Sequence, residues 1–190
     1  MVTRQDRGSR GRLGDPRGRH GGSGLVPGED APGGVVPGAV VLPLASAGAV
    51  PSAVRSAGVR STEDCPCGSG MVYGSCCEPV LDGGAAATAE ALVRSRFTAF
   101  VVGDEDHLFR TWHPRTRPEG PYCHPGTQWT SLTIGEVAGG GPRDDTGVVE
   151  LVARYRTGDG RGGVVADTLR ERSRLVRRGG RWVYYDGEVR

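Results

Sequence analysis

The stretch Cys65-Pro66-Cys67-Gly68-Ser69-Gly70 places two cysteines one residue apart, and Tyr73 and the adjacent pair Cys76-Cys77 follow it closely. Gly68 and Gly70 permit a tight turn, which would bring the second cysteine pair back toward the first. Four thiolates that meet at one point suit a tetrahedral zinc ion, and iron is the alternative for an all-sulfur site. The stretch therefore predicts a metal site whose ligands are Cys65, Cys67, Cys76 and Cys77.

The first 60 residues have a different composition from the rest of the chain. They hold thirteen of the 33 glycines and six of the thirteen prolines, but no aromatic residue. Such a segment cannot bury enough apolar surface to offset the conformational entropy of an ordered chain. We expect residues 1–60 to be a disordered leader, or, if translation begins at a codon such as that of Val59, a segment that is not translated.

Charge and cysteine usage restrict the partners and the compartment. The leader carries a formal charge of +4 and the remaining residues −2, so we expect no nucleic-acid-binding face in the folded part.

Five cysteines, with closely spaced pairs that suit disulfides poorly, indicate a reducing cytoplasm. The alternative is a signal peptide with Val35–Val50 as its apolar run. Prolines interrupt that run, and they also argue against a membrane-spanning helix.

The pattern after the cysteines is typical of two helices followed by strands. Apolar residues recur at helical spacing over Ala89–Val102, with Thr88 as the predicted N-cap and Arg96 within the apolar stripe. A second helix is expected over Asp104–Trp112, ending before Pro114. Strand patterns cover Trp129–Ala138, Gly147–Thr157, Val164–Arg177 and Arg181–Asp186. The chain therefore predicts an α+β domain with helices on one face of an antiparallel sheet.

Several blocks of the chain resemble known bacterial families. The pattern Cys65-x-Cys67-Gly-Ser-Gly-x2-Tyr73-x2-Cys76-Cys77 resembles the SEC-C motif, a zinc-binding module that also occurs at the C-terminus of the SecA translocation ATPase. The blocks that resemble the YchJ family are Thr88–Phe100, Thr111–Pro118, Glu171–Leu175 and Trp182–Gly187. The resemblance implies a SEC-C metal knuckle over residues 61–80. It also implies a domain with the nuclear transport factor 2-like fold over residues 85–188, a cone in which helices cover a curved antiparallel sheet around a cavity. No activity is established for that family, so the resemblance implies an architecture rather than a reaction.

The first functional hypothesis is a cytoplasmic metal-binding protein. A closed four-cysteine site leaves no position for substrate, so the zinc, or iron, would have a structural role. The knuckle could then dock a protein partner. SEC-C modules commonly carry lysines where this chain has Met71, Val72, Gly74 and Ser75, which weakens a basic docking face. The implied fold often dimerises through its sheet, so the resemblance also implies a homodimer.

The second hypothesis is a small-molecule binder or an acid–base enzyme. Alternation along Val164–Arg177 turns Glu171 and Ser173 toward the core side, and we expect Arg96, His113 and Glu171 to converge on a pocket. His113 would be the proton acceptor. The full set of pocket candidates is Arg96, Trp112, His113, Arg117, Glu171 and Ser173. The alternative is a structural network in which Arg96 pairs with Glu171 and His113 caps a helix end.

Overall fold

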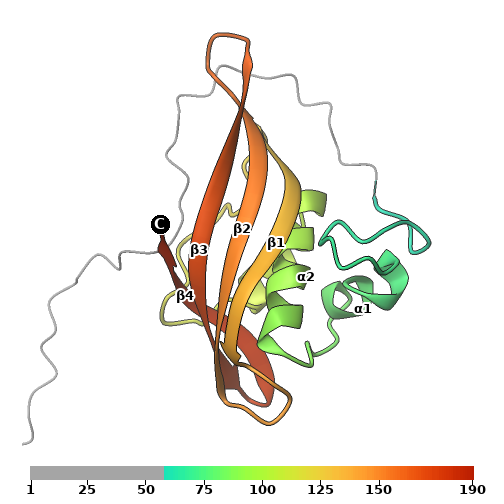
Figure 1. The fold of residues 1–190 in the computed structure, drawn as a ribbon, viewed down its shortest axis with the longest axis vertical. Helices are drawn as coiled ribbons and strands as arrows, with labels where there is room; N and C mark the ends of the chain where they lie inside the picture. The colour runs from blue at the N-terminus through green and yellow to red at the C-terminus, as the bar shows by residue number, and fades with distance from the viewer. Residues whose placement is uncertain (1–57) are drawn as a thin grey trace, which may run out of the picture. The chain divides into compact units, whose positions relative to one another are not determined.

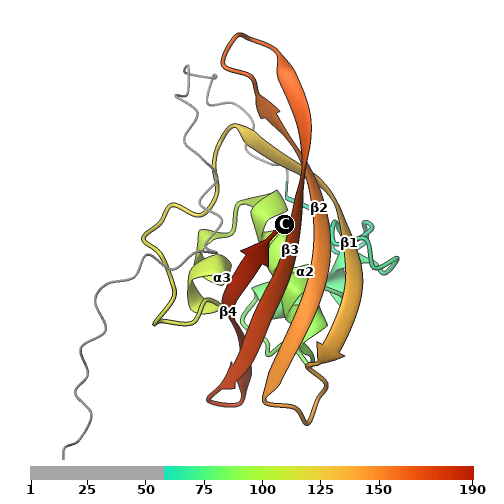
Figure 2. The ribbon, with the colours of Figure 1, turned by 60° about the vertical axis from the view of Figure 1, so that its left-hand side comes forward.

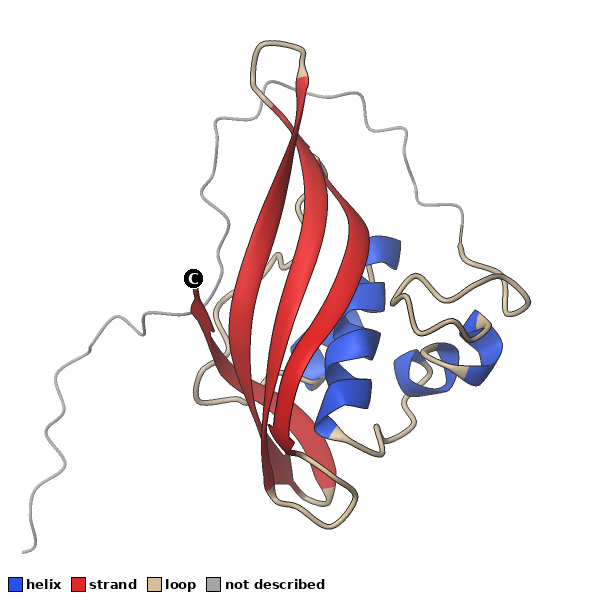
Figure 3. Ribbon diagram, in the orientation of Figure 1, coloured by secondary structure: helices blue, strands red, loops and turns tan. Residues whose placement is uncertain are grey.

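The computed structural model describes residues 58–190, so the expected leader, apart from its last three residues, lies outside the described part. Short helical elements come first and a four-stranded sheet follows (Figures 1 and 3). The helical elements are η1 (Tyr73–Ser75), α1 (Glu78–Leu81), α2 (Ala89–Val102) and α3 (Glu105–Arg110). The strands are β1 (Thr127–Gly139), β2 (Thr146–Gly158), β3 (Val164–Arg178) and β4 (Arg181–Val189). The predicted α+β class is confirmed.

The sheet has the simplest order, β1-β2-β3-β4, and all three neighbouring pairs are antiparallel. Helix α2 lies against its concave face (Figure 2). One core cluster there joins Leu92 of α2 to Val149, Leu175 and Trp182 of the strands. Burial of these apolar side chains, at roughly 25 cal/mol per Å² of area removed from water, is what holds the helix on the sheet.

Both ends of α2 are set by local chemistry. The Thr88 side chain accepts a hydrogen bond from the Ala91 backbone N–H at 3.1 Å, which satisfies one of the free donors at the helix start. The helix ends at Val102, and the C-cap residue Gly103 has a left-handed φ of 77°, which glycine adopts easily. The predicted N-cap and both boundaries of this helix are confirmed.

The second helix is shorter than expected, because its predicted last turn pairs with a strand instead. Helix α3 ends at Arg110 rather than Trp112. The backbone N–H of Tyr184 donates to the Thr111 carbonyl, and the His113 N–H donates to the Tyr184 carbonyl, each at 2.8 Å. Trp112 and Tyr184 thereby form a parallel bridge. This short extension of the sheet fixes Trp112 beside β4.

A bulge in β4 decides which of its side chains face the helices. Leu175 is opposite Tyr184, but Arg174 is opposite Asp186, so Tyr185 has no partner in the register. An extra residue in one strand reverses the alternation beyond it. Tyr184 and Gly187 consequently lie on the same face as Leu175, whereas strict alternation would have turned Gly187 to the opposite face.

Within residues 58–190 no helix has both the length and the apolar character needed to cross a membrane, and the longest, α2, has 14 residues. The cysteine segment, which we define as residues 61–80, lies beside α2 and the edge strand β1 (Figure 1).

Candidate metal centre and cavity

The four predicted ligands come together at one point in the cysteine segment. Asp64 and Val72 face each other across the turn as an isolated antiparallel bridge. Its two hydrogen bonds run from the Cys65 N–H to the Met71 carbonyl at 2.9 Å and from the Tyr73 N–H to the Glu63 carbonyl at 2.8 Å. Cys76 and Cys77 follow the turn of η1. The Sγ atoms of Cys65, Cys67, Cys76 and Cys77 all lie within 4.8 Å of one another.

The spacing of the sulfur atoms fits a tetrahedral metal ion. Cys67 Sγ is 3.6 Å from Cys76 Sγ, which is 3.8 Å from Cys77 Sγ. Zinc–sulfur bonds of about 2.3 Å in tetrahedral geometry place the ligand atoms about 3.8 Å apart. All five described cysteines are free thiols. The donor set can therefore bind a metal ion with little movement of the chain.

The thiols influence one another strongly because they share hydrogen bonds. The hydrogen bond with Cys67 raises the pKa of Cys65 to about 11, and hydrogen bonds with Cys65 and Cys67 raise the pKa of Cys77. The same contacts with Cys65 and Cys77 lower the pKa of Cys67. The cluster thus favours one thiolate among protonated neighbours, and a cation is what would allow all four to ionise together.

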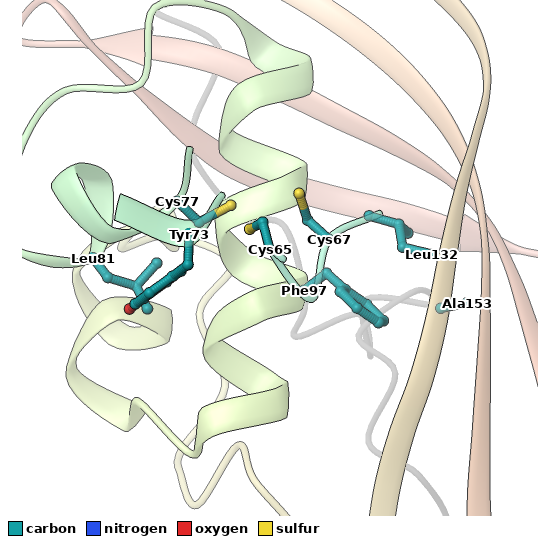
Figure 4. Packing of buried hydrophobic residues seen from close by; sticks show 8 residues of the cluster. All are labelled: Cys65, Cys67, Tyr73, Cys77, Leu81, Phe97, Leu132 and Ala153. Carbon is teal, nitrogen blue, oxygen red and sulfur yellow. The ribbon is translucent and has the colours of Figure 1, made fainter. Parts of the chain in front are cut away.

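The cysteine segment is part of the hydrophobic core rather than an appendage. Cys65, Cys67 and Cys77 are buried with Phe97 of α2 and Leu132 of β1 (Figure 4). Tyr73 belongs to the same cluster. A guanidinium N–H of Arg94 donates to the Cys67 carbonyl at 3.0 Å. Core packing and this hydrogen bond together fix the cysteine turn against α2.

A separate cavity of about 120 Å³ lies between α2, the sheet and the connection from α3 to β1. Its apolar part is lined by residues that include Phe97, Phe100, Trp129, Leu132, Leu151 and Leu169. Its polar part is lined by Arg96, Trp112, Glu171, Ser173 and Tyr184. An engineered apolar cavity of about 150 Å³ is large enough to hold benzene, so this cavity suits a small organic molecule.

Arg96 is the charged centre of the polar part. Its Nη1 donates to the Leu108 carbonyl at 3.1 Å and to Thr111 Oγ1 at 2.9 Å. The guanidinium also lies over the rings of Trp112 and Tyr184, at 4.9 and 4.7 Å, and such contacts partly offset the loss of water. Burial lowers the pKa of Arg96 to about 10, so it remains charged at neutral pH.

Glu171 is held by two hydroxyl groups at one of its oxygens. Ser173 Oγ and Tyr184 Oη donate to Glu171 Oε1 at 2.6 and 2.9 Å. Within residues 58–190, Oε2 makes no hydrogen bond and Glu171 forms no ion pair. Burial raises the pKa of Glu171, although these hydrogen bonds and the charge of Arg96 oppose the shift. The carboxyl group is therefore more basic than usual and has one oxygen free to meet a ligand.

Four of the six pocket candidates line this cavity, and two do not. His113 is absent from the lining, and its ring contacts that of Tyr185 at a centroid distance of 5.0 Å. The Arg117 guanidinium lies 3.5 Å over the Phe109 ring and donates to the Phe109 carbonyl. The expected convergence of His113 with Arg96 and Glu171 is corrected, because pairing with β4 turns the residue after Trp112 away from the cavity.

The alternative prediction, in which Arg96 pairs with Glu171 and His113 caps a helix end, is also corrected. Among the described residues, no ion pair joins Arg96 to Glu171, and Tyr184 instead lies between them, with its ring under the guanidinium and its hydroxyl on the carboxylate. His113 does not cap α3, since Thr111 is the C-cap residue.

Sequence reasoning missed the residues that organise the polar part of the cavity. Tyr184 is not among the pocket candidates, although it contacts both charged groups. Gly187 was not considered, yet a Cβ at this position would lie 2.2 Å from Glu171 Oε1 and 2.6 Å from Tyr184 Oη. A glycine within a strand often marks a bulge or a close approach of other atoms, so Gly187 is the sequence feature that could have indicated this contact.

Comparisons with known proteins identify both parts of the chain. The family model for the YchJ middle NTF2-like domain matches residues 88–187, and the SEC-C motif model matches residues 62–79. A UPF0225 protein of Streptomyces coelicolor is 49% identical over 128 residues, covering 67% of this chain and 96% of the relative. A UPF0225 protein of Corynebacterium glutamicum is 44% identical over 126 residues, with 66% and 96% covered.

Two solved structures are similar to the described fold. The solution structure of a SEC-C motif containing protein from Rhodopseudomonas palustris has a TM-score of 0.55 and 30% identity, and the match covers 66% of this chain and 98% of that one. The crystal structure of a SEC-C motif containing protein from Psychrobacter arcticus has a TM-score of 0.50 and 24% identity, and covers 68% and 84%. The second likeness concerns the fold alone.

Proposed function

Since the chain belongs to the YchJ family of bacterial proteins and carries a SEC-C motif, we propose that it is a cytoplasmic zinc protein whose metal stabilises a ligand-binding domain. The observation that carries the metal assignment is the meeting of four Sγ atoms within 4.8 Å. Zinc, which needs no redox chemistry to bind four thiolates, is the proposed ion, with iron as the alternative. The cytoplasm is proposed because metal ligation requires reduced thiols.

The metal would have a structural role. Four cysteines complete a tetrahedral shell, so no coordination position remains for a substrate. The residues around the shell support this role, because Cys65, Cys67 and Cys77 pack with Phe97 and Leu132 in the core. When bound, the ion would neutralise thiolates that otherwise oppose one another's ionisation.

Elemental analysis tests the metal assignment directly. We expect protein purified without chelator to contain one equivalent of zinc and the Cys67→Ser variant to lose it. Cys123→Ser is the matched control, because Cys123 is outside the cluster and its loss should leave the metal content unchanged. A full equivalent of metal in the Cys67→Ser protein would contradict the assignment, and a visible absorption band from iron would change the identity of the ion.

The cavity supports a second function, the binding of a small organic molecule. Its lining is apolar at one side, while Arg96 offers donors and Glu171 Oε2 offers an acceptor at the other. A ligand with a compact apolar body, an acceptor for Arg96 and a donor for Glu171 would satisfy both groups. If the site is catalytic, Glu171 would take the proton-accepting role that the sequence assigned to His113.

Native mass spectrometry tests this second function. We expect a small molecule to accompany the wild-type protein and to be lost from Ala153→Leu, because Ala153 lines the cavity and a larger side chain would fill it. Val152→Leu, on the opposite face of β2 by strand alternation, is the matched control. Equal ligand content in the two variants would exclude this cavity as the binding site.

A further inference from the structure

A second cleft, which shares only Trp112 with the lining of the cavity around Arg96 and Glu171, carries an unusual charge distribution. It measures about 290 Å³ and lies between the α1–α2 connection, the end of α3 and the β3–β4 hairpin. Four arginines line it: Arg110, Arg117, Arg178 and Arg181. Its lining contains no aspartate or glutamate, and none of these four arginines takes part in an ion pair among the described residues.

Three of the arginines are held in place by backbone carbonyls. Arg110 donates to the Leu81 carbonyl, Arg117 to that of Phe109, and Arg181 to that of Gly83. A carbonyl oxygen fixes the direction of a guanidinium without neutralising its charge. The positive charges are therefore positioned in advance and remain without counter-charges.

Two of the residues that line the same cleft carry buried hydrogen-bond donors without partners. Among the described residues, the buried side-chain nitrogen and oxygen atoms that lack a hydrogen-bond partner are the indole Nε1 atoms of Trp112 and Trp182. Both residues line this cleft, and they are only 7% and 2% exposed. An unsatisfied buried donor costs about 1–3 kcal/mol, so a ligand acceptor that reaches either indole N–H would recover that energy.

We propose that this cleft is a binding site for a small molecule bearing phosphate groups. Phosphate oxygens are strong acceptors, and planar guanidinium groups bind them with paired, charge-assisted hydrogen bonds. Four uncompensated arginines match a ligand with several negative charges better than a monocarboxylate, which would neutralise only one. The concave shape and its volume favour a compact metabolite over the extended backbone of a nucleic acid.

Arg178 offers the cleanest test of this proposal. Its side chain makes no hydrogen bond or ion pair within residues 58–190, so Arg178→Gln should leave the melting temperature unchanged. We expect inorganic pyrophosphate to bind wild-type protein in isothermal titration calorimetry, and the variant to bind at least about tenfold more weakly, since a charged hydrogen bond contributes about 1.5–3 kcal/mol. Arg154→Gln is the matched control, with the same charge change on an exposed position of β2 away from the cleft.

The three tryptophans provide a second readout in the same protein. We expect pyrophosphate to shift the indole N–H resonance of Trp182, which lines the cleft alone, and not that of Trp129, which lines the other cavity alone. Trp112 lines both, so its resonance does not distinguish the two sites. The proposal is overturned if millimolar pyrophosphate leaves the Trp182 resonance in place, or if Arg154→Gln weakens binding as much as Arg178→Gln. Tighter, competitive binding of a short RNA would assign the cleft to a nucleic-acid backbone and would likewise overturn it.

Discussion

Glu171 shows how one buried residue can connect pH to stability. Burial raises its pKa above the usual value of about 4.3, so the folded protein holds the proton more tightly than the unfolded chain does. The resulting stabilisation is complete below the unfolded pKa and is lost as pH rises through the folded pKa. Ionised Glu171 therefore costs stability at neutral pH.

We expect the Glu171→Gln variant to lose less stability than the wild type as pH rises from 5 to 8. The amide keeps an oxygen for Ser173 and Tyr184 but cannot ionise. Urea unfolding at several pH values measures the effect as the difference between the two proteins. His107, whose pKa burial lowers to about 3, destabilises both proteins equally as pH falls below about 6.5, so it cancels in this difference. Parallel curves would contradict the prediction.

The face on which a site residue lies could be predicted where the regular alternation of a strand or the spacing of a helix decides it. Alternation along β3 correctly turned Glu171 and Ser173 to the same face, and helical spacing put Arg96 in the buried stripe of α2. His113 was misplaced because its direction depends on pairing between Trp112 and Tyr184, residues far apart in the sequence. No local pattern encodes such a contact.

The bulge in β4 is the element on which the polar part of the cavity depends. It places Gly187 opposite Ser173 and turns both toward the helices. Room for the Glu171 carboxyl and the Tyr184 hydroxyl exists only because Gly187 has no side chain. Strand boundaries were predicted to within a few residues, but the bulge was not, because alternation assumes one residue per position throughout a strand.

We expect Gly187→Ala to destabilise the protein by about 1–3 kcal/mol, the typical cost of an overpacked core. The new methyl group would displace the Glu171 carboxyl and break its hydrogen bonds with Ser173 and Tyr184. Gly126→Ala is the control, because a Cβ there meets no atom within 4 Å and its φ is not left-handed. Chemical denaturation of the three proteins gives the comparison, and equal stability of the two variants would disprove the steric argument.

At the scale of the molecule, the cysteine segment and the sheet domain share one core. The resemblance implied two separate regions, residues 61–80 and 85–188, because the SEC-C pattern and the YchJ-like blocks lie in different parts of the chain. Packing of Cys65, Cys67 and Cys77 on Phe97 and Leu132 joins them. A partner of the cysteine segment, a homodimer and the cone shape stay predictions.

We therefore expect removal of the metal to destabilise the whole described domain. Thermal unfolding followed by tryptophan fluorescence should show one transition, which moves to lower temperature when a zinc chelator is added. Trp129 and Trp182, which belong to the sheet, report on the domain rather than on the cysteine segment. An unchanged tryptophan transition in fully metal-free protein would show that the two parts fold independently.

Helix α2 presents Arg94 to the cysteine turn and, two residues later, Arg96 to the cavity. Because one helix contacts both the cysteine turn and the cavity, binding at one site can change the affinity of the other. If a ligand in the cavity binds the metal-loaded protein more tightly than the metal-free protein, then the protein binds the metal more tightly when that ligand is present. The two affinities increase by the same factor. A shortage of metal would then lower the fraction of metal-loaded protein, and a high concentration of the ligand would raise it.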